Sequence, residues 1–228
     1  MAGAIVGAAC QPEFLQMKSI VILISGRGSN LQALLDADLP DCRLAVIGNR
    51  PDAAGLVQSR RRGVATTVVD HRDFAIRADF DAALAEAIEF HQPDLVAMAG
   101  FMRVVGDAFV RRFEGRLINI HPSLLPAFPG LRTHAQALAA GVKIHGCSVH
   151  FVTALLDAGP IVIQAAVPVL PGDTEESLAA RVLRQEHVIY PQALRWFLAG
   201  RLSLTAAGQV QIDGENVADS TLIAPSVK

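Results

Sequence analysis

The sequence is poor in cysteine and lacks the histidine spacing of common metal sites. Its 228 residues include three cysteines, at positions 10, 42 and 147, and no CxxC pair. Three unpaired cysteines provide neither a disulfide framework nor a zinc knuckle, and they fit a reduced, cytoplasmic compartment. The seven histidines show no HExxH pattern. We therefore expect no metal site.

The chain also lacks long apolar runs and net charge of one sign. Hydrophobic residues make up 51% of it, yet no run approaches the roughly 18 residues that span a bilayer. Such a composition excludes a disordered protein and predicts a buried core. A formal net charge of -2 provides no basic face for nucleic acid. We expect a protein with small-molecule ligands that binds neither membrane nor nucleic acid; its oligomeric state stays open.

Short apolar runs alternate with longer amphipathic segments. This pattern predicts an α/β fold with a single Rossmann-like domain: an open twisted sheet, mostly parallel, with helices on both faces. The first five strands are expected at residues 20–24, 44–47, 66–69, 95–98 and 117–120. The helices between them are expected at residues 31–36, 53–62, 79–90 and 107–113.

The texture changes after residue 120. Three prolines predict an irregular loop over residues 121–132, followed by a helix at 133–140. Residues 145–153 alternate like a half-exposed strand, and a further strand is expected at 161–169. Asp173 or Thr174 would cap a long helix to about Tyr190, where Pro191 interrupts it before a last helical piece to Gly200. We expect a disordered extension at 1–16, one domain at 17–204, and a tail at 205–228.

A glycine-rich turn joins the first strand to the first helix over Ser25–Asn30. Glycines there let the backbone approach a ligand, and the helix N-terminus attracts anions. A dinucleotide fingerprint would need glycine in place of Leu31 and an acidic residue in place of Asn49. The turn therefore predicts a cradle for one phosphate, or else a tight turn that only caps the helix. The donors of the cradle would be Gly28, Ser29 and Asn30.

A second group of polar residues lies where a central strand ends. Asn119 and His121 fall on the same side of that strand, where ligands of open α/β sheets bind. The amide can donate to a developing oxyanion, and the imidazole can exchange a proton near neutral pH. Asp157 would favour the imidazolium if it lies near His121; otherwise it is a turn residue before Gly159. No GxSxG motif is present, so direct transfer without a covalent nucleophile is expected.

Four motifs together resemble the folate-dependent formyltransferases: residues 23–32 (LISGRGSNLQ), 118–126 (INIHPSLLP), 145–152 (HGCSVHFV) and 157–160 (DAGP). The resemblance extends from about Lys18 to about Leu204. It implies direct passage of a formyl group from 10-formyltetrahydrofolate, as cosubstrate, to the amine of glycinamide ribotide in de novo purine biosynthesis.

The resemblance also implies roles for individual residues. Asn119 would hold the formyl oxygen, His121 would donate a proton, Asp157 would keep His121 charged, and a water would relay protons. The ribotide would contact Gly28, Ser29 and Asn30 through its phosphate, and Leu183 and Glu186 elsewhere. Leu183 departs from the family, where a longer polar residue is common. The folate would contact Arg77, Met102, Arg103, Val104, Val105, Asn119, Thr153, Ala154, Leu155, Leu156 and Asp157. Of these, Arg77 would reach the glutamate tail, and the loop 153–157 would close over the pterin.

Three other functions are open to the same fold. Relatives that formylate initiator methionyl-tRNA carry an additional RNA-contacting domain, for which we expect no room here. Relatives that hydrolyse formyltetrahydrofolate carry an N-terminal regulatory domain, but the same residues could direct water at the formyl group, so hydrolysis is the enzymatic alternative. The phosphate cradle argues against it. A catalytically silent ribotide- or folate-binding protein is the third alternative, and the retained Asn119, His121 and Asp157 argue against that one.

Overall fold

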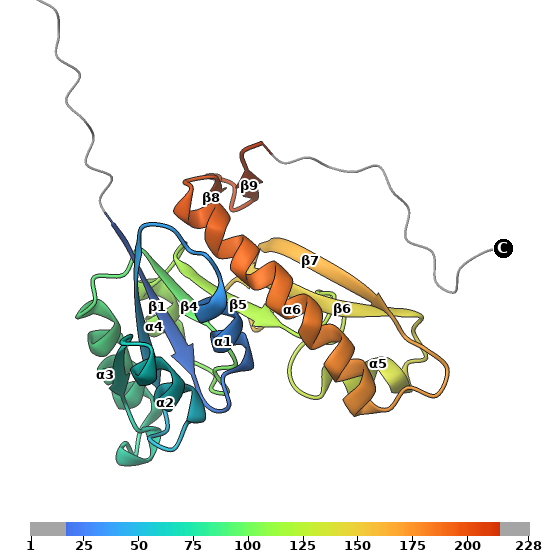
Figure 1. The fold of residues 1–228 in the computed structure, drawn as a ribbon, viewed down its shortest axis with the longest axis horizontal. Helices are drawn as coiled ribbons and strands as arrows, with labels where there is room; N and C mark the ends of the chain where they lie inside the picture. Colours follow the sequence, from blue (N-terminus) through green and yellow to red (C-terminus); the bar gives the residue numbers. More distant parts are fainter. Residues whose placement is uncertain (1–16, 215–228) are drawn as a thin grey trace, which may run out of the picture.

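The computed structural model describes residues 17–214 (Figure 1). In chain order its elements are β1 (Lys18–Ile24), α1 (Ser29–Asp36), β2 (Cys42–Gly48), α2 (Ala54–Arg61), β3 (Ala65–Val68), the 3-10 turn η1 (His71–Asp73), α3 (Arg77–Glu89), β4 (Leu95–Met98), α4 (Asp107–Arg112), β5 (Leu117–His121), α5 (Thr133–Ala139), β6 (Ile144–Phe151), β7 (Ile161–Pro168), α6 (Glu175–Leu198), β8 (Leu202–Leu204) and β9 (Val210–Ile212).

Seven strands form one sheet in the order β3-β2-β1-β4-β5-β6-β7. The first five are parallel, whereas β6 pairs antiparallel with both β5 and β7. The predicted single α/β domain with a mostly parallel sheet is confirmed. Because the chain leaves β1 toward β2 and later returns to β4, the switch in strand order lies between β1 and β4, where ligands of such sheets bind.

Helices cover both faces of the sheet, as expected. The even-numbered side chains of β1, such as Ile20 and Ile22, pack with Leu31 of α1, Leu56 of α2 and Leu178 of α6. The odd-numbered ones pack with α3 and α4. Figure 1 shows α6 crossing one face of the sheet beside α1. Within the described part of the chain, none of the helices has the length and apolarity that a bilayer crossing demands.

The long helix α6 does not end at Pro191, which corrects the expected interruption. A proline inside a helix removes one hydrogen bond and costs about 3 kcal/mol. That cost is offset because the same stretch buries Tyr190 and Leu194 completely, at about 1.5–3 kcal/mol for each large apolar side chain. The Tyr190 hydroxyl also donates to the Met98 carbonyl at 3.0 Å. Packing on the sheet thus carries the helix through the proline.

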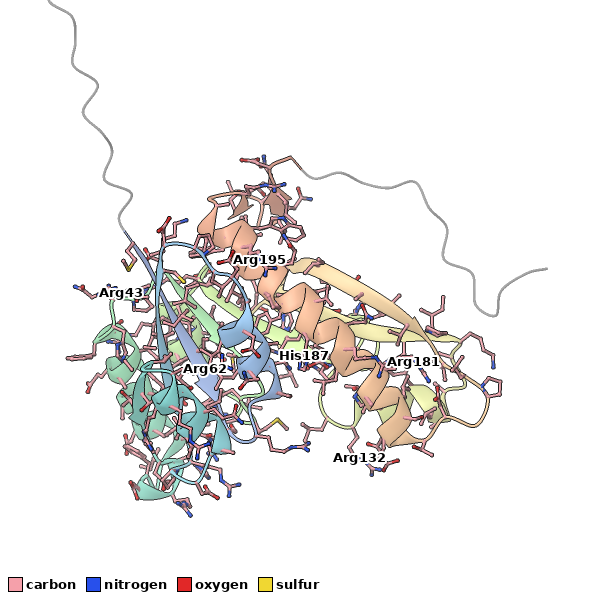
Figure 2. All side chains as sticks on the ribbon, viewed as in Figure 1. Arg43, Arg62, Arg132, Arg181, His187 and Arg195 are labelled. Atoms are coloured by element: carbon pink, nitrogen blue, oxygen red, sulfur yellow. The ribbon has the colours of Figure 1, made fainter. Side chains whose placement is uncertain are left out.

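The start of α6 follows the sequence more closely. Thr174 caps the helix, and its side chain and that of Ser177 satisfy each other's backbone amides. Arg181, labelled in Figure 2, donates to both oxygens of Asp173 at 2.7 and 2.9 Å and to the Pro168 carbonyl at 2.9 Å. These bonds hold the N-terminus of α6 against the end of β7.

The strand β6 differs from the expected half-exposed strand, because nearly all of it is buried. Its polar side chains are accommodated by partners inside the protein. His145 lies 3.2 Å from the imidazole of His134, Ser148 bonds to the loop after β5, and His150 contacts Asn119. The polar residues that alternate along β6 therefore form hydrogen bonds inside the protein and do not face solvent.

The ends of the predicted domain lie partly outside the described residues. The expected extension at 1–16 and residues 215–228 of the expected tail are not described. Residue 204, the expected end of the domain, falls in a hairpin in which β8 pairs antiparallel with β9.

Candidate active site

The carboxyl end of β5 carries two candidate catalytic residues. Ile118 and Ile120 pack into the core on the α6 side, so Asn119 and His121 point to the opposite side of the sheet. His121 is 5% exposed, whereas Asn119 is half-buried. The strand therefore presents an amide and an imidazole side by side, as its alternation predicts.

The loop after β6 returns Asp157 to His121. The Oδ2 of Asp157 lies 3.6 Å from the Nδ1 of His121, and both side chains are nearly buried. The backbone of Asp157 is left-handed, at φ 50°. Gly159 lets the loop fold back, because a Cβ there would lie 1.8 Å from the Phe151 carbonyl oxygen. The structure thus brings Asp157 to Asn119 and His121, which precede it by more than thirty positions in the sequence.

The loop between β5 and α5 holds both members of this pair through its main chain. The Nε2 of His121 lies 3.0 Å from the Phe128 carbonyl, so this nitrogen carries a hydrogen. The Gly130 amide donates to Asp157 Oδ2 at 2.8 Å. The separation of 3.6 Å between His121 Nδ1 and Asp157 exceeds the 2.7–3.2 Å of a normal hydrogen bond. Of the two ring nitrogens, Nδ1 is therefore the one without a hydrogen-bond partner.

A buried network fixes that loop to the sheet. The Ser148 hydroxyl on β6 donates to the Ser123 carbonyl at 2.7 Å and accepts from the Leu125 amide at 3.1 Å. Gln164 on β7 donates to the Leu125 carbonyl at 3.0 Å and to the Ser148 hydroxyl at 2.8 Å. At the far end of the loop, Arg132, labelled in Figure 2, lies 3.4 Å from Glu175 of α6. Two strands thus determine where the main-chain groups that hold the His121–Asp157 pair lie.

His150 is a residue of this site that sequence reasoning missed. It lies opposite Asn119 in the β5–β6 register, and its Nε2 is 3.3 Å from Asn119 Nδ2 and 3.9 Å from Asp157 Oδ1. Its Nδ1 lies 2.9 Å from the Phe151 carbonyl and so carries the hydrogen, which leaves Nε2 to accept from the Asn119 amide. Burial lowers the pKa of His150, which favours this neutral form. Its only signal in the sequence was the 145–152 motif.

The predicted phosphate cradle forms the turn from β1 into α1. Gly28 has φ 76° and lies close to α2, where a Cβ on Gly28 would be 3.2 Å from the Gly55 Cα. Within residues 17–214, the backbone amides of Gly28, Ser29 and Asn30 donate to no protein backbone group. These three unpaired donors at a helix N-terminus suit an anion.

The cradle opens into a hollow of about 520 Å³. The walls of this hollow include Asn49 and His71 on one side, and Met102 and Arg103 on the other. Asn119, His121 and Asp157 are not among its lining residues; they lie at the end of β5, two strands from β1. The hollow thus connects the cradle to the segment expected to bind folate.

The two groups of expected ribotide contacts meet through one buried bond. The Asn30 side-chain amide donates to Glu186 Oε2 of α6 at 2.6 Å, and both residues are buried. Burial raises the pKa of Glu186, and the bond from Asn30 opposes that rise. Leu183 lies half-buried one turn before Glu186. The Asn30 side-chain NH2 is thus engaged by Glu186, whereas its backbone amide donates to no backbone group among residues 17–214.

The residues expected to bind folate lie in two irregular segments and at the start of α3. Met102 and Val104 are 68% and 61% exposed, and Leu155 and Leu156 of the second segment are 72% and 55% exposed. Arg77, the first residue of α3, lies near the end of the first segment, with Nη2 3.5 Å from where a Cβ of Gly106 would be. The remaining members of the two segments are Arg103, Val105, Thr153 and Ala154. Exposed apolar side chains of this kind suit a flat hydrophobic ligand.

No grouping of three or more His, Cys, Asp or Glu side chains suited to a metal ion occurs in residues 17–214. The described site offers an amide, two imidazoles, a carboxylate and main-chain donors. Together with the sheet, these groups define an α/β protein with free main-chain amides after its first strand and an imidazole–carboxylate pair at the end of β5.

Comparison with known proteins assigns this architecture. The family model described as formyl transferase matches residues 18–194. The phosphoribosylglycinamide formyltransferase of Escherichia coli K12 is 50% identical over 190 residues, which cover 82% of this chain and 90% of that protein. The crystal structure of glycinamide ribonucleotide transformylase 1 from Symbiobacterium toebii has a TM-score of 0.82 and 51% identity, covering 86% of this chain and 94% of that one. The chain belongs to the formyl transferase family.

A formyltetrahydrofolate deformylase of Pseudomonas syringae pv. tomato is more distant. Its structure has a TM-score of 0.78 and 28% identity, and the match covers 86% of this chain but 66% of that one. The fold is thus shared with an enzyme whose title names a different reaction, so the fold does not by itself separate the two activities.

Proposed function

We propose that the chain transfers the formyl group of 10-formyltetrahydrofolate directly to the amine of 5'-phosphoribosylglycinamide, giving formylglycinamide ribotide and tetrahydrofolate in de novo purine biosynthesis. The observation that carries the proposal is the pairing of His121 with Asp157 beside Asn119, at 3.6 Å between His121 Nδ1 and Asp157 Oδ2. In this arrangement His121 is the acid, Asp157 stabilises its charge, and Asn119 is the amide donor.

The reaction proceeds by attack of the ribotide amine on the formyl carbon. The carbonyl oxygen gains negative charge, and the second N–H of Asn119, the one not given to His150, stabilises it. The bond from the formyl carbon to N10 of the folate then breaks and N10 takes a proton supplied by His121. The proton that the attacking amine releases passes back to His121, which restores the imidazolium. The carboxylate of Asp157 stabilises the positive charge on His121 before that transfer.

The route of the proton follows from the contacts of His121. Its Nε2–H is given to the Phe128 carbonyl, so the proton leaves from Nδ1, at the edge that faces Asp157. The imidazole is 5% exposed, and a water at this edge would carry the proton between His121 and N10. General acid catalysis of this kind contributes about 10²–10⁴-fold in rate.

The ribotide and the folate use separate groups. The backbone amides of Gly28, Ser29 and Asn30 hold the ribotide phosphate, and Leu183 and Glu186 contact its sugar and glycinamide portion. The folate lies between residues 102–105 and the loop 153–157, and Arg77 reaches its glutamate tail. Both substrates are small molecules. We infer a cytoplasmic location because Cys42 and Cys147 are free thiols.

Hydrolysis of formyltetrahydrofolate is the competing function, since water could replace the ribotide amine. The phosphate cradle favours transfer, because hydrolysis requires no phosphate-bearing acceptor. The test supplies purified protein with 10-formyltetrahydrofolate and measures release of tetrahydrofolate. Release is expected only when the ribotide is present, with formylglycinamide ribotide appearing in equal amount. Release without ribotide would establish the hydrolase, and binding without release would establish a silent binding protein.

A further inference from the structure

The segment expected to bind folate has an unusual set of free main-chain groups. Residues 102–106 have no regular structure and lie between β4, which ends at Met98, and α4. We call them the folate-wall segment. In the described part of the chain, no hydrogen bond to protein involves the amides and carbonyls of Arg103, Val104 and Val105. Three donors and three acceptors are thus left for a ligand such as a pterin ring. A stretch without internal bonds keeps one conformation only if its ends are held.

The first end of the segment is held by Ser25. The Ser25 hydroxyl, directly after β1, accepts from the Met102 amide at 2.8 Å. Ser25 is 8% exposed, and its own amide donates to the Gly100 carbonyl at 3.2 Å. The buried side chain of Phe101 anchors the same point. The start of the folate-wall segment is therefore fixed to the end of β1.

The second end is held by Asp81 of α3. Its Oδ2 accepts from the Gly106 amide at 2.8 Å, and Asp81 is 7% exposed. The close approach depends on glycine, because a Cβ on Gly106 would lie 3.1 Å from that oxygen. Between the two ends, the Arg103 guanidinium lies over the ring of Phe80, the residue before Asp81, at 5.4 Å from the ring centre. Helix α3 thus determines where the segment ends.

Only one of the two oxygens of Asp81 has a hydrogen-bond partner in the described part of the chain. Its other oxygen, Oδ1, is buried and has no hydrogen-bond partner among residues 17–214. A buried carboxylate with an unsatisfied oxygen destabilises a protein, and an apolar residue at such a site is often neutral or stabilising. Residues that break a stability rule in this way are found at functional sites. The contacts of Asp81 indicate that its role is to hold Gly106.

We propose that Asp81 and Ser25 are positioning residues, which hold the two ends of the folate-wall segment so that the free main-chain groups of residues 103–105 bind the pterin of the formyl donor. Asp81 acts through the Gly106 amide and Ser25 through the Met102 amide. The inference rests on the proposed function, because it takes the formyl donor to be the ligand of this segment.

The test compares steady-state constants of the full chain. Asp81→Leu keeps the size and removes the acceptor, whereas Asp81→Asn keeps an oxygen that can accept from Gly106. We expect Asp81→Leu to raise the KM for 10-formyltetrahydrofolate about tenfold while the KM for the ribotide stays within twofold of wild type. Asp81→Asn should have a folate KM within threefold of wild type. Ser25→Ala is expected to show the same split from the other end of the segment. Asp79→Leu, two residues away and exposed on the same helix, is the control and should change neither KM.

Each other result counts against the proposal. An unchanged folate KM in Asp81→Leu and Ser25→Ala overturns it, and so does a parallel change in both KM values, which would indicate general damage to the fold. If Asp81→Leu does not fold, Ser25→Ala and Gly106→Ala carry the test, since the added Cβ displaces Asp81. Calorimetric titration of the wild type with tetrahydrofolate distinguishes failure of the proposed function from failure of the positioning role. If the wild type neither binds tetrahydrofolate nor transfers the formyl group, the proposed function fails. If it does both and the variants have unchanged KM values, only the positioning role fails.

Discussion

The side-chain amide of Asn30 donates a hydrogen bond of 2.6 Å to the carboxyl of Glu186, which joins the first turn of α1 to the middle of α6. The two residues lie 156 positions apart in the chain. The bond leaves the side-chain oxygen of Asn30, Oδ1, buried and without a partner among residues 17–214. The phosphate cradle is therefore coupled to a buried acidic group.

Glu186 makes stability depend on pH in a defined direction. Burial raises the pKa of its carboxyl above the ordinary 4.5, so the stability it contributes is present below that value and is lost as pH rises through the folded pKa. Glu186→Gln keeps an acceptor for Asn30 and cannot ionise. We expect the free energy of unfolding of this variant minus that of wild type to increase from pH 4 to pH 8 in urea titrations, because only the wild type loses stability over this range. The exposed Glu114→Gln is the control, and a difference that does not vary with pH contradicts the argument.

Much of the fold could be predicted because its strands are buried on both faces. The run at residues 20–24 predicted the core of β1, and the glycines after it predicted the tight turn into α1 with its Gly28. Local patterns failed where distant packing decides. Pro191 continues a helix because Tyr190 and its neighbours are buried on the sheet, and β6 is buried although its pattern predicted exposure on one side.

The candidate site was predictable in its residue types and not in its contacts. Asn119 and His121 share a face by strand alternation alone. The antiparallel pairing that places His150 against Asn119 cannot be read from local periodicity. The same holds for the carbonyl of Phe128 and the amide of Gly130, because main-chain groups carry no residue signature. A motif thus predicts candidate side chains, and the fold determines what holds them.

The His121–Asp157 pair is expected to serve turnover and not ribotide binding. His121→Ala removes the proton donor, and Asp157→Asn removes the charge that stabilises it, so each should lower kcat about 10²–10⁴-fold. The ribotide Kd, measured by calorimetry, should stay within about twofold, because the cradle is two strands away. His91→Ala, at the end of α3, is the matched histidine control. Near-normal turnover in either site variant would show that the assigned roles are wrong.

His150 is expected to act by orienting the Asn119 amide. His150→Gln can still accept from Asn119, whereas His150→Leu cannot; we expect kcat within about threefold of wild type for the former and about tenfold lower for the latter, given about 1–1.5 kcal/mol for one hydrogen bond. Asn119→Leu removes the oxyanion donor itself and should cost about 3–4 kcal/mol of transition-state stabilisation. Equal kcat values for the two His150 variants would rule out this role.

The phosphate cradle can be tested against a second glycine of the same backbone type. Gly28 has φ 76° and Gly63 has φ 72°, but a Cβ on Gly63 meets nothing within 4 Å. Alanine at either position should destabilise the protein by about 1–2 kcal/mol, because left-handed backbone disfavours a side chain. Only Gly28→Ala should raise the KM for the ribotide, by about tenfold, since it shifts the cradle donors against α2. A similar rise in Gly63→Ala would assign the effect to stability alone.

Acid should destabilise the protein below about pH 6.5, and His145 is the residue to test. It is 1% exposed, and burial, aided by the nearby His134, lowers its pKa to about 4. Between the unfolded value of 6.5 and the folded value, the unfolded chain binds a proton that the native protein does not, so stability is lost as pH falls through this window. The loss attributable to His145 is at most about 1.4 kcal/mol per pH unit, and on the order of 3 kcal/mol in full. His145→Gln keeps a polar partner for His134 and binds no proton, so urea unfolding from pH 7 to pH 4.5 should show a shallower decline than in wild type. An equal decline in both proteins would contradict this argument, because it would mean that His145 binds its proton as readily in the native state as in the unfolded chain.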